Sequence, residues 1–324
     1  PTFNRASLLD ECLGILIPQI SGKSDVEVLI VDNASTDGTE RVVERYFQHG
    51  QVRYLRNSSN EGYAGSQRRC IEEANGEYTA ILCDDDIYIP GQVDRLLEYL
   101  SGEPVAFLAQ NYYSFSGNYL EPHTIELAPE QDRVFERAYD VMNYPSVGHF
   151  SGFVFNSVLA KAQLKLVLKR RPVSDFEPHR GLVSELATRV TAHATLAAVF
   201  LGKRGVAARV PAERDYDDLG HLCVDYLSPF VDWRNEGIIT DSDYEYRVNL
   251  VMAFLWRAIV KDAFRYSTEE LQGLEAKLAL ALGQNARFRM FEQPLLKFAR
   301  VRAVRSAYRR AFLGYRRIRG KRPA

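Results

Sequence analysis

The chain has 324 residues, and its 41 Lys and Arg residues against 42 Asp and Glu residues give a formal net charge of -1. This balance excludes a protein that binds polyanions through its bulk charge. A hydrophobic fraction of 46% and a charged fraction of 26% are typical of globular proteins and exclude a disordered or collagen-like chain. The four cysteines lack paired spacing, which excludes a disulfide scaffold and favours a reducing compartment. No apolar run approaches the roughly 20 residues of a membrane-spanning helix.

Helices and strands are predicted to alternate over the first 110 residues. Apolar residues at helical spacing predict helices at residues 7–20, 41–47, 62–74 and 92–100. Runs rich in β-branched and apolar residues predict strands at residues 26–31, 52–55, 78–83 and 105–109. Strands separated by helices imply an α/β fold with a mostly parallel sheet and helices on both faces. The loop-like residues 1–5 lead us to expect that a strand precedes them in the natural chain.

The remainder of the chain is predicted to become helical. Residues 113–146 have no strong period and residues 149–155 are apolar, whereas helices are predicted at 184–200, 244–264, 268–282 and from 293. Residues 220–236 are turn-rich and are predicted to be a connection. We therefore expect a catalytic domain at 1–220, with a nucleotide half at 1–110 and an acceptor half at 111–220, followed by a helical extension at 221–324.

Acidic residues follow two of the predicted strands. Asp32 directly follows the strand at 26–31, and Asp84, Asp85 and Asp86 follow the strand at 78–83. Ligands of open α/β sheets bind outside the carboxyl ends of the strands. Three adjacent carboxylates repel one another unless a cation neutralises them, and Mg²⁺ or Mn²⁺ is the simplest such cation. The alternative is a solvated acidic turn before the helix at 92–100.

Five short motifs occur in order along the first 90 residues. They are residues 1–5 (PTFNR), 31–39 (VDNASTDGT), 60–62 (NEG), 75–78 (NGEY) and 83–90 (CDDDIYIP). In this order and at these spacings they resemble the family 2 glycosyltransferases, which have the GT-A fold. The resemblance implies an inverting enzyme that uses a nucleotide-sugar, most simply a UDP-sugar. It also implies that the first loop and Asp32 hold the nucleoside, while a DxD-type motif holds a metal ion on the diphosphate.

The resemblance assigns roles to individual residues. Thr2, Asn4 and Arg5 match the first loop, and Asp32 is expected to accept a hydrogen bond from the base, its alternative being a strand-end cap. Gly62 and Arg68 lie at a predicted helix start that favours a phosphate, although Arg68 is equally well explained as a surface residue. Asp85 is expected to be the principal metal ligand and Asp86 the next candidate, with Asp84 facing the sugar or ribose. Cys83 occupies the place where many family members carry the first Asp.

The catalytic base is less well marked. Inverting transfer needs a carboxylate that takes the proton of the attacking hydroxyl. The family places it in a Glu-Asp pair at the start of a late helix, and this chain has no such pair there. Glu185 is the nearest match, with Asp175 and His193 as further candidates, and Glu185 is equally well explained as an ordinary first-turn glutamate. Residues 149–153 are expected to line the acceptor side or to form a core strand.

The residues from 297 onward are strongly basic. Eleven Lys and Arg residues and no acid lie between Lys297 and Arg322, and aromatic residues interleave at helical spacing. Such a segment suggests an anionic membrane surface, and its alternative is a tail packed on the acidic body. We expect no nucleic-acid partner, because no nucleic-acid-binding module accompanies the basic stretch. This reading places the chain in the cytoplasm, peripheral at the inner face of the membrane.

The sequence leaves three functions open. The first is a metal-dependent glycosyltransferase that acts on a saccharide or lipid-linked acceptor in surface polysaccharide or glycolipid assembly. The second is a nucleotidyltransferase, which would attack phosphorus, but the glycine-rich loop expected of that class is missing from residues 1–6. The third is a catalytically degenerate protein that binds a sugar nucleotide, which the absent Glu-Asp pair favours and the acidic motifs oppose.

Overall fold

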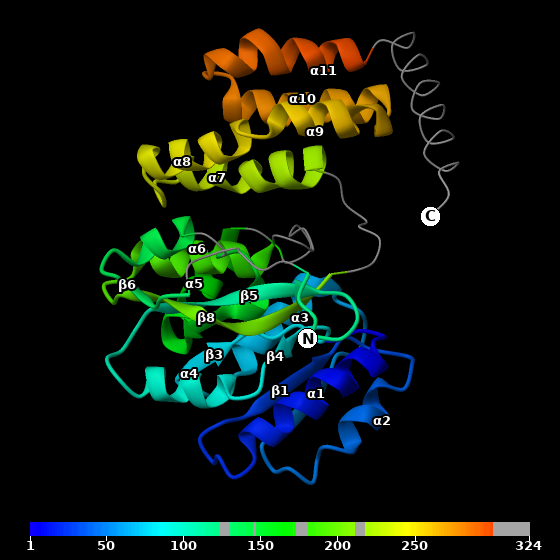
Figure 1. Cartoon of the computed structure of the whole chain (residues 1–324), viewed down its shortest axis with the longest axis vertical. Helices are drawn as coiled ribbons and strands as arrows, with labels where there is room; N and C mark the ends of the chain where they lie inside the picture. The colour runs from blue at the N-terminus through cyan, green and yellow to red at the C-terminus, as the bar shows by residue number, and fades with distance from the viewer. Residues whose placement is uncertain (124–129, 145–146, 171, 173–180, 211–217, 301–324) are drawn as a thin grey trace. The chain divides into compact units, whose positions relative to one another are not determined.

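The computed structural model divides into two compact units, residues 1–212 and 213–324. It describes all residues except 124–129, 145–146, 171, 173–180, 211–217 and 301–324 (Figure 1). The candidate base Asp175 and all but the first four residues of the basic tail therefore lie outside the described residues.

The predicted helices and strands of the first hundred residues are confirmed, with ends that differ by a few residues. The helices are α1 (Ala6–Ile20), α2 (Thr39–Glu44), α3 (Gly62–Glu73) and α4 (Gln92–Leu100). The strands are β1 (Val28–Asp32), β2 (Val52–Arg56) and β3 (Tyr78–Ala80), and a two-residue strand β4 (Ile87–Tyr88) follows the acidic motif. β1 pairs with β2 in parallel, and Thr2 forms a parallel bridge to Asp32, so the first loop begins in register with the end of β1.

A larger sheet contains β3 and β4 together with β5 (Phe107–Phe115), β6 (Arg133–Phe135), β7 (Phe153–Asn156) and β8 (Ala198–Arg209). Its order is β3-β7-β5-β8-β4, and β6 also pairs with β8. β5 and β8 are parallel, whereas β3–β7, β5–β7, β4–β8 and β6–β8 are antiparallel. The α/β class is confirmed, and strand directions are more mixed than the alternation of elements predicted, because β4 runs antiparallel to β8, and β6 and β7 from the weakly patterned middle of the chain run antiparallel to their neighbours.

The order of this sheet places the acidic motif. β3 and β4 follow each other in the chain, yet they lie at opposite ends of the sheet order. The Ile81 amide still donates to the Phe153 carbonyl of β7, and the Ile89 amide already donates to the Gly205 carbonyl of β8. The intervening residues 81–86 therefore cross from β7 to β8, and the three aspartates lie where the ends of several strands meet.

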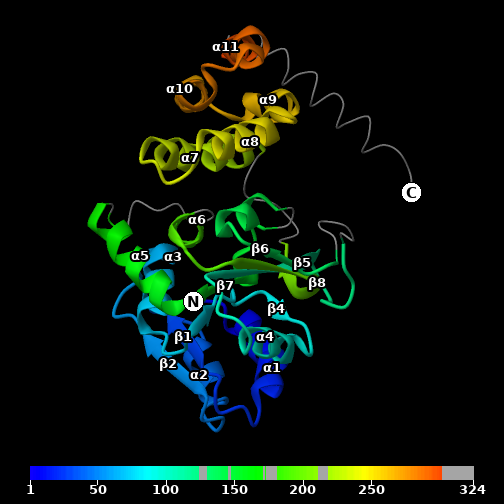
Figure 2. The same cartoon turned by 90° about the vertical axis from the view of Figure 1, so that its left-hand side faces the viewer.

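The core packs between the sheet and helices on its two faces. α1 and α4 bury Leu13, Ile17 and Leu96 against Leu108 and Val199 of the central strands. α6 (Leu182–His193) covers the opposite face, as both views show (Figures 1 and 2). α5 (Ser157–Arg170) packs beside α6 and α3.

The predicted helix at 184–200 is wrong at its C-terminal end. α6 ends at His193, and residues 198–200 belong to β8. These residues pair with β5 on one side and β6 on the other. Two neighbouring strands satisfy their backbone groups, and this pairing outweighs the modest helical preference of the Ala-rich sequence.

The second unit is helical, as predicted. Its elements are η4 (Asp218–Asp225), α7 (Tyr226–Asn235), α8 (Asp241–Met252), α9 (Leu255–Asp262), η5 (Ala263–Arg265), α10 (Thr268–Leu282), η6 (Phe288–Glu292) and α11 (Gln293–Ala299). Capping boxes at Thr240 and Ser267 fix the starts of α8 and α10. The predicted turn-rich connection at 220–236 is instead largely helical, because Cys223, Leu227 and Trp233 are buried in this unit. None of the helices among the described residues is long and apolar enough to span a bilayer.

Candidate active site

The first loop lies against the end of β1. The Thr2 amide donates to the Val31 carbonyl at 2.9 Å, and the Asn33 amide donates to the Thr2 carbonyl at 2.9 Å. The Thr2 side chain is buried, and its Oγ1 has no hydrogen-bond partner among the described residues. A buried hydroxyl without a partner is costly. The Thr2 hydroxyl is therefore an unsatisfied polar group where the first loop meets the end of β1.

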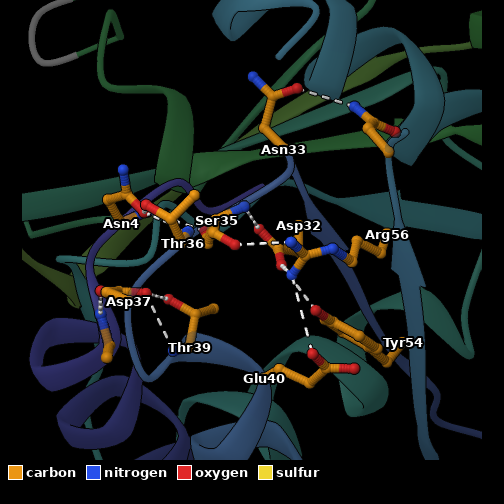
Figure 3. Close-up of polar contacts among 12 residues, drawn as sticks. Asn4, Asp32, Asn33, Ser35, Thr36, Asp37, Thr39, Glu40, Tyr54 and Arg56 are labelled. Carbon is orange, nitrogen blue, oxygen red and sulfur yellow. Dashed lines mark hydrogen bonds and ion pairs between the residues drawn. The ribbon is translucent and has the colours of Figure 1, made fainter. Parts of the chain in front are cut away.

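Asn4 joins the first loop to the loop that follows β1 (Figure 3). Its φ of 52° is left-handed, a conformation that Asn tolerates better than most residues. Its amide donates to Ser35 Oγ at 2.9 Å, and its Oδ1 accepts from the Thr36 amide at 2.7 Å. Asp37 adds a second link, because its Oδ2 accepts from the Ala6 amide at the start of α1. The Asn4 side chain thus supports the loop, and its direct contact with a nucleotide stays a prediction.

Asp32 is completely buried at the end of β1. Its Oδ1 accepts from the Ser35 amide at 2.9 Å, and its Oδ2 accepts from Tyr54 Oη at 2.6 Å and Arg56 Nη1 at 3.1 Å (Figure 3). Both partners belong to β2, which the sequence did not connect with Asp32. Recognition of a base by Asp32 stays a prediction.

The start of α3 is fixed by a network of asparagines. Gly62 has a φ of 73°, and its amide donates to Asn60 Oδ1 at 2.8 Å. Asn33 donates to the same oxygen at 2.7 Å, which ties the loop after β1 to this helix. Arg68, six residues further along α3, pairs with Glu61 at 2.9 Å and Glu72 at 2.7 Å. Contact of Arg68 with a phosphate stays a prediction, since two carboxylates already neutralise its guanidinium.

Residues Cys83–Asp86, which we call the aspartate loop, face the first loop through Arg5. Arg5 Nη1 lies 3.1 Å from Asp84 Oδ1 and 3.0 Å from Asp85 Oδ2. Burial and the charges of Asp86 and Asp84 raise the pKa of Asp85 to about 6, although Arg5 opposes this shift. The sequence prediction that the first loop and the acidic motif form one site is thus consistent with the structure, which joins them by an ion pair.

Asp86 has a different environment from Asp85. Its Oδ2 accepts from His149 Nε2 at 2.7 Å and Ser151 Oγ at 2.5 Å, and its Oδ1 accepts from the Arg209 amide at 2.8 Å. Burial favours a higher pKa, but the His149 charge and these three hydrogen bonds outweigh it and lower the pKa of Asp86. The protein itself therefore holds Asp86 in its charged form.

The donor set of the aspartate loop fits a divalent cation. Cys83 Sγ and carboxylate oxygens of Asp85 and Asp86 lie within 4.8 Å of one another. Asp85 is the better candidate ligand, because burial and the charges of Asp86 and Asp84 disfavour its ionised form, and a bound cation would offset this. Burial raises the pKa of the Cys83 thiol to about 12, so it is a poorer donor than Asp85. The residues present thus fit Mg²⁺ or Mn²⁺ chiefly through Asp85.

The candidate bases are placed apart from one another. Glu185 lies in the first turn of α6, is 8% exposed, and accepts from Arg189 Nε at 2.8 Å. His193 is exposed and is the last residue of the same helix. At about 1.5 Å per residue, two helical residues eight positions apart are separated by roughly 12 Å along the axis. Glu185 and His193 therefore do not act on one proton, and the role of either stays a prediction.

Sequence reasoning missed several residues that build this site. Arg209, at the end of β8, donates through Nε to the Asp85 carbonyl at 3.1 Å and through Nη2 to Glu11 Oε2 at 2.6 Å. Its guanidinium also lies over the Phe115 ring, 4.5 Å from the centroid. No local pattern marks this arginine, because its importance depends on the strand order that brings β8 beside the aspartate loop.

With this geometry established, comparisons with known proteins identify the domain. Residues 1–156 match the family model described as glycosyl transferase family 2. Abequosyltransferase RfbV of Salmonella typhimurium is 34% identical over 110 residues, which are 33% of this chain and 33% of that protein. Glycosyltransferase GlyG of Streptococcus pneumoniae is 27% identical over 116 residues, which are 36% of this chain and 38% of that protein. The chain thus spans about a third of the length of these curated relatives.

A solved structure supports the fold over a longer range. Staphylococcus aureus TarS residues 1–349, in complex with UDP, matches with a TM-score of 0.66 at 16% sequence identity, covering 96% of this chain and 90% of that chain. Identity this low shows a shared fold and nothing of the substrate. The family-model match therefore identifies residues 1–156 as a family 2 glycosyltransferase domain, and the structural likeness shows that the GT-A fold is shared over the longer range.

Proposed function

We propose that this protein is a metal-dependent, inverting glycosyltransferase that moves a sugar from a nucleotide-sugar to a hydroxyl acceptor. The observation that carries the proposal is Asp85, a carboxylate whose pKa is raised to about 6 and which lies beside Arg5 of the first loop. A site of this kind gains stability when a cation and the phosphates that accompany it arrive. The match of residues 1–156 to glycosyl transferase family 2 supports sugar transfer as the type of reaction.

The donor is a nucleotide-sugar held between the first loop and the aspartate loop. The first loop places Thr2 beside Asp32 at the end of β1, and Asp84, which is 7% exposed, forms an ion pair with Arg5 at 3.1 Å. Asp85 would hold Mg²⁺ or Mn²⁺, which stabilises negative charge on a departing diphosphate. Arg5 provides further positive charge on the same side of the site.

The acceptor hydroxyl attacks the anomeric carbon as the bond from that carbon to the diphosphate oxygen breaks. The hydroxyl proton passes to a carboxylate, for which we propose Glu185, and the nucleoside diphosphate leaves with the bonding electrons. Glu185 is buried beside Arg189, and this pair would have to open or rotate for Glu185 to accept the proton. Single displacement at this carbon inverts its configuration.

The acceptor is proposed to be a saccharide or a lipid-linked saccharide at a membrane surface. One relative, 27% identical over 89 residues, is named UDP-Glc:alpha-D-GlcNAc-diphosphoundecaprenol beta-1,3-glucosyltransferase WfaP of Escherichia coli, a name that contains both a UDP-sugar and a lipid-linked acceptor. The basic segment that begins at Lys297 would hold the enzyme at anionic lipid. In the described part of this segment, Phe298 is 56% exposed on α11. This arrangement suits a peripheral protein at the cytoplasmic face.

Calorimetry with UDP and UDP-sugars, with and without Mn²⁺, tests the donor site. We expect binding to require Mn²⁺ and to be lost in Asp85→Asn. The matched control is Asp25→Asn, which changes an exposed aspartate that precedes β1, at the end of the strand opposite Asp32. Undiminished Mn²⁺-dependent binding in Asp85→Asn would overturn the metal assignment.

Product analysis separates the remaining functions. A glycosyltransferase releases a nucleoside diphosphate from its donor, whereas a nucleotidyltransferase forms or consumes pyrophosphate. Slow hydrolysis of a nucleotide-sugar without acceptor, yielding the nucleoside diphosphate, supports the proposal. Tight binding of the donor with neither hydrolysis nor transfer to any acceptor would favour the catalytically degenerate protein instead.

A further inference from the structure

Asp86 is held by residues that come from distant parts of the chain. Its side chain is 2% exposed, and its three donors His149, Ser151 and Arg209 lie 63, 65 and 123 positions further along. Burial of a carboxylate is unfavourable unless hydrogen bonds or opposite charge compensate for it. Here both oxygens are engaged, so the compensation comes from the protein and needs no added cation.

Two of these donors also hold the neighbouring residues of the aspartate loop. Ser151 Oγ accepts from the Cys83 amide at 2.9 Å, two residues before Asp85. Arg209 Nε donates to the Asp85 carbonyl at 3.1 Å, and its Nη2 is anchored on Glu11 of α1. The loop backbone is therefore fixed on both sides of Asp85, while Arg5, itself 49% exposed, is the ion-pair partner that the described residues give the Asp85 carboxylate.

The imidazole of His149 is oriented by an aromatic neighbour. Its ring centroid lies 4.9 Å from that of Tyr112 in β5, with 32° between the ring planes. Such a contact restricts rotation of the ring and directs Nε2 towards Asp86. β5, β8 and the segment before β7 thus all contribute to one arrangement around a single carboxylate.

We infer that Asp86 is a positioning residue, clamped by His149, Ser151 and Arg209, which fixes the aspartate loop so that Asp85 alone of the pair ligates the cation. The inference rests on the proposed function for the identity of the cation, and it replaces our sequence-based expectation that Asp86 is a second metal ligand. Outer partners of metal ligands orient them, and their loss typically costs 10- to 100-fold in metal affinity. His149 and Ser151 act on the cation through Asp86.

Metal binding distinguishes a positioning role from a ligand role. In the presence of UDP, titration calorimetry with Mn²⁺ should show an affinity about 10-fold lower in His149→Phe, which keeps an aromatic ring beside Tyr112 but loses the donor. His149→Gln, which keeps a donor, should recover most of this loss. Asp86→Asn should bind Mn²⁺ about 10- to 100-fold more weakly but measurably. Asp85→Asn should show no binding.

A double-mutant cycle tests whether His149 acts through Asp86. If it does, His149→Phe has little further effect on Mn²⁺ affinity in the Asp86→Asn background. Additive losses would show that His149 acts on the cation independently and would overturn the inference. Complete loss of Mn²⁺ binding in Asp86→Asn, equal to that in Asp85→Asn, would also overturn it by making Asp86 a ligand.

A metal-free measurement keeps the clamp testable if the wild-type protein binds no Mn²⁺, an outcome that would defeat the proposed function by itself. The Arg209 amide donates to Asp86, so its hydrogen exchange reports whether Asp86 stays in place. We expect exchange of this amide to rise about tenfold in His149→Phe and Ser151→Ala. The control Ser157→Ala removes another buried hydroxyl, which bonds to Thr79, and should leave this amide unchanged. Unchanged exchange in His149→Phe and Ser151→Ala would refute the clamp.

Discussion

The substitution Asp85→Asn should stabilise the metal-free protein while it abolishes metal binding. Asp85 has a pKa of about 6 in the folded protein against an ordinary value of 3.8, a rise caused by burial and by the charges of Asp86 and Asp84. At 1.36 kcal/mol per unit, the ionised form is disfavoured by about 3 kcal/mol. The side chain keeps 26% exposure, so solvent screening reduces the expected gain at pH 7 to about 1–2 kcal/mol.

The pH dependence of this effect has a definite sign. The folded protein holds the Asp85 proton more tightly than the unfolded chain does, so the contribution of this group to stability falls as the pH rises from 3.8 to about 6. Asparagine cannot ionise, so the stability of Asp85→Asn relative to the wild type should increase between pH 3.8 and about 6 and remain constant at higher pH. At pH 4 the variant and the wild type should be nearly equal.

Thermal unfolding in EDTA measures the difference. A gain of about 1–2 kcal/mol corresponds to a rise of about 2–8 °C in the Tm of a unit of this size. Asp86→Asn should unfold at a lower temperature, because it loses a charge that His149, Ser151 and Arg209 stabilise. Addition of Mn²⁺ should raise the Tm of the wild type and leave that of Asp85→Asn unchanged. An Asp85→Asn protein that melts below the wild type at pH 7 without metal would refute the electrostatic reasoning.

Three further outcomes are expected. Asp32→Asn should lower the free energy of unfolding by about 1–3 kcal/mol in urea titrations, because Arg56 loses its buried partner, and calorimetry should show weaker UDP binding. Glu185→Gln should leave the donor Kd within about twofold of the wild-type value, while steady-state turnover falls by roughly 10²-fold. If the variant keeps wild-type turnover, Glu185 is not the base, and Asp175 and His193 are the next candidates. A chain cut before Lys297 should no longer co-sediment with anionic vesicles. The full chain should bind them, and added salt should release it, because charges attract only within a Debye length of about 8–10 Å at physiological salt.

Local chemistry was enough to predict much of the nucleotide half. The alternation of β-branched runs and helical apolar spacing marked β1, β2, α1, α3 and α4, because each of these elements buries a face whose period is visible in its own sequence. The resemblance to family 2 glycosyltransferases, read from short motifs at residues 1–90, is confirmed by the family model that matches residues 1–156. Tight turns and acidic strand ends are local features, so they can be recognised in the sequence before the fold is known.

The middle of the chain was predicted less well for a physical reason. Residues 198–200 form part of β8 because β5 and β6 pair with them from both sides, and neither neighbour is adjacent in the sequence. Helix and strand propensities differ by a fraction of a kcal/mol per residue, so the available partners decide the outcome. The stretch at 220–236 became helical in the same way, through the burial of Leu227 and Trp233 in the second unit.

The sequence by itself determined which acidic side chains follow the strands, and the tertiary structure decided which partners each of them meets. The sequence ranked the three consecutive aspartates only by their place in the motif, with Asp85 expected as the principal metal ligand. In the structure, Asp84 and Asp85 face Arg5, while Asp86 faces His149, Ser151 and Arg209. The difference arises because residues 81–86 cross from β7 to β8, which brings donors up to 123 positions away to Asp86 and leaves Asp85 with Arg5.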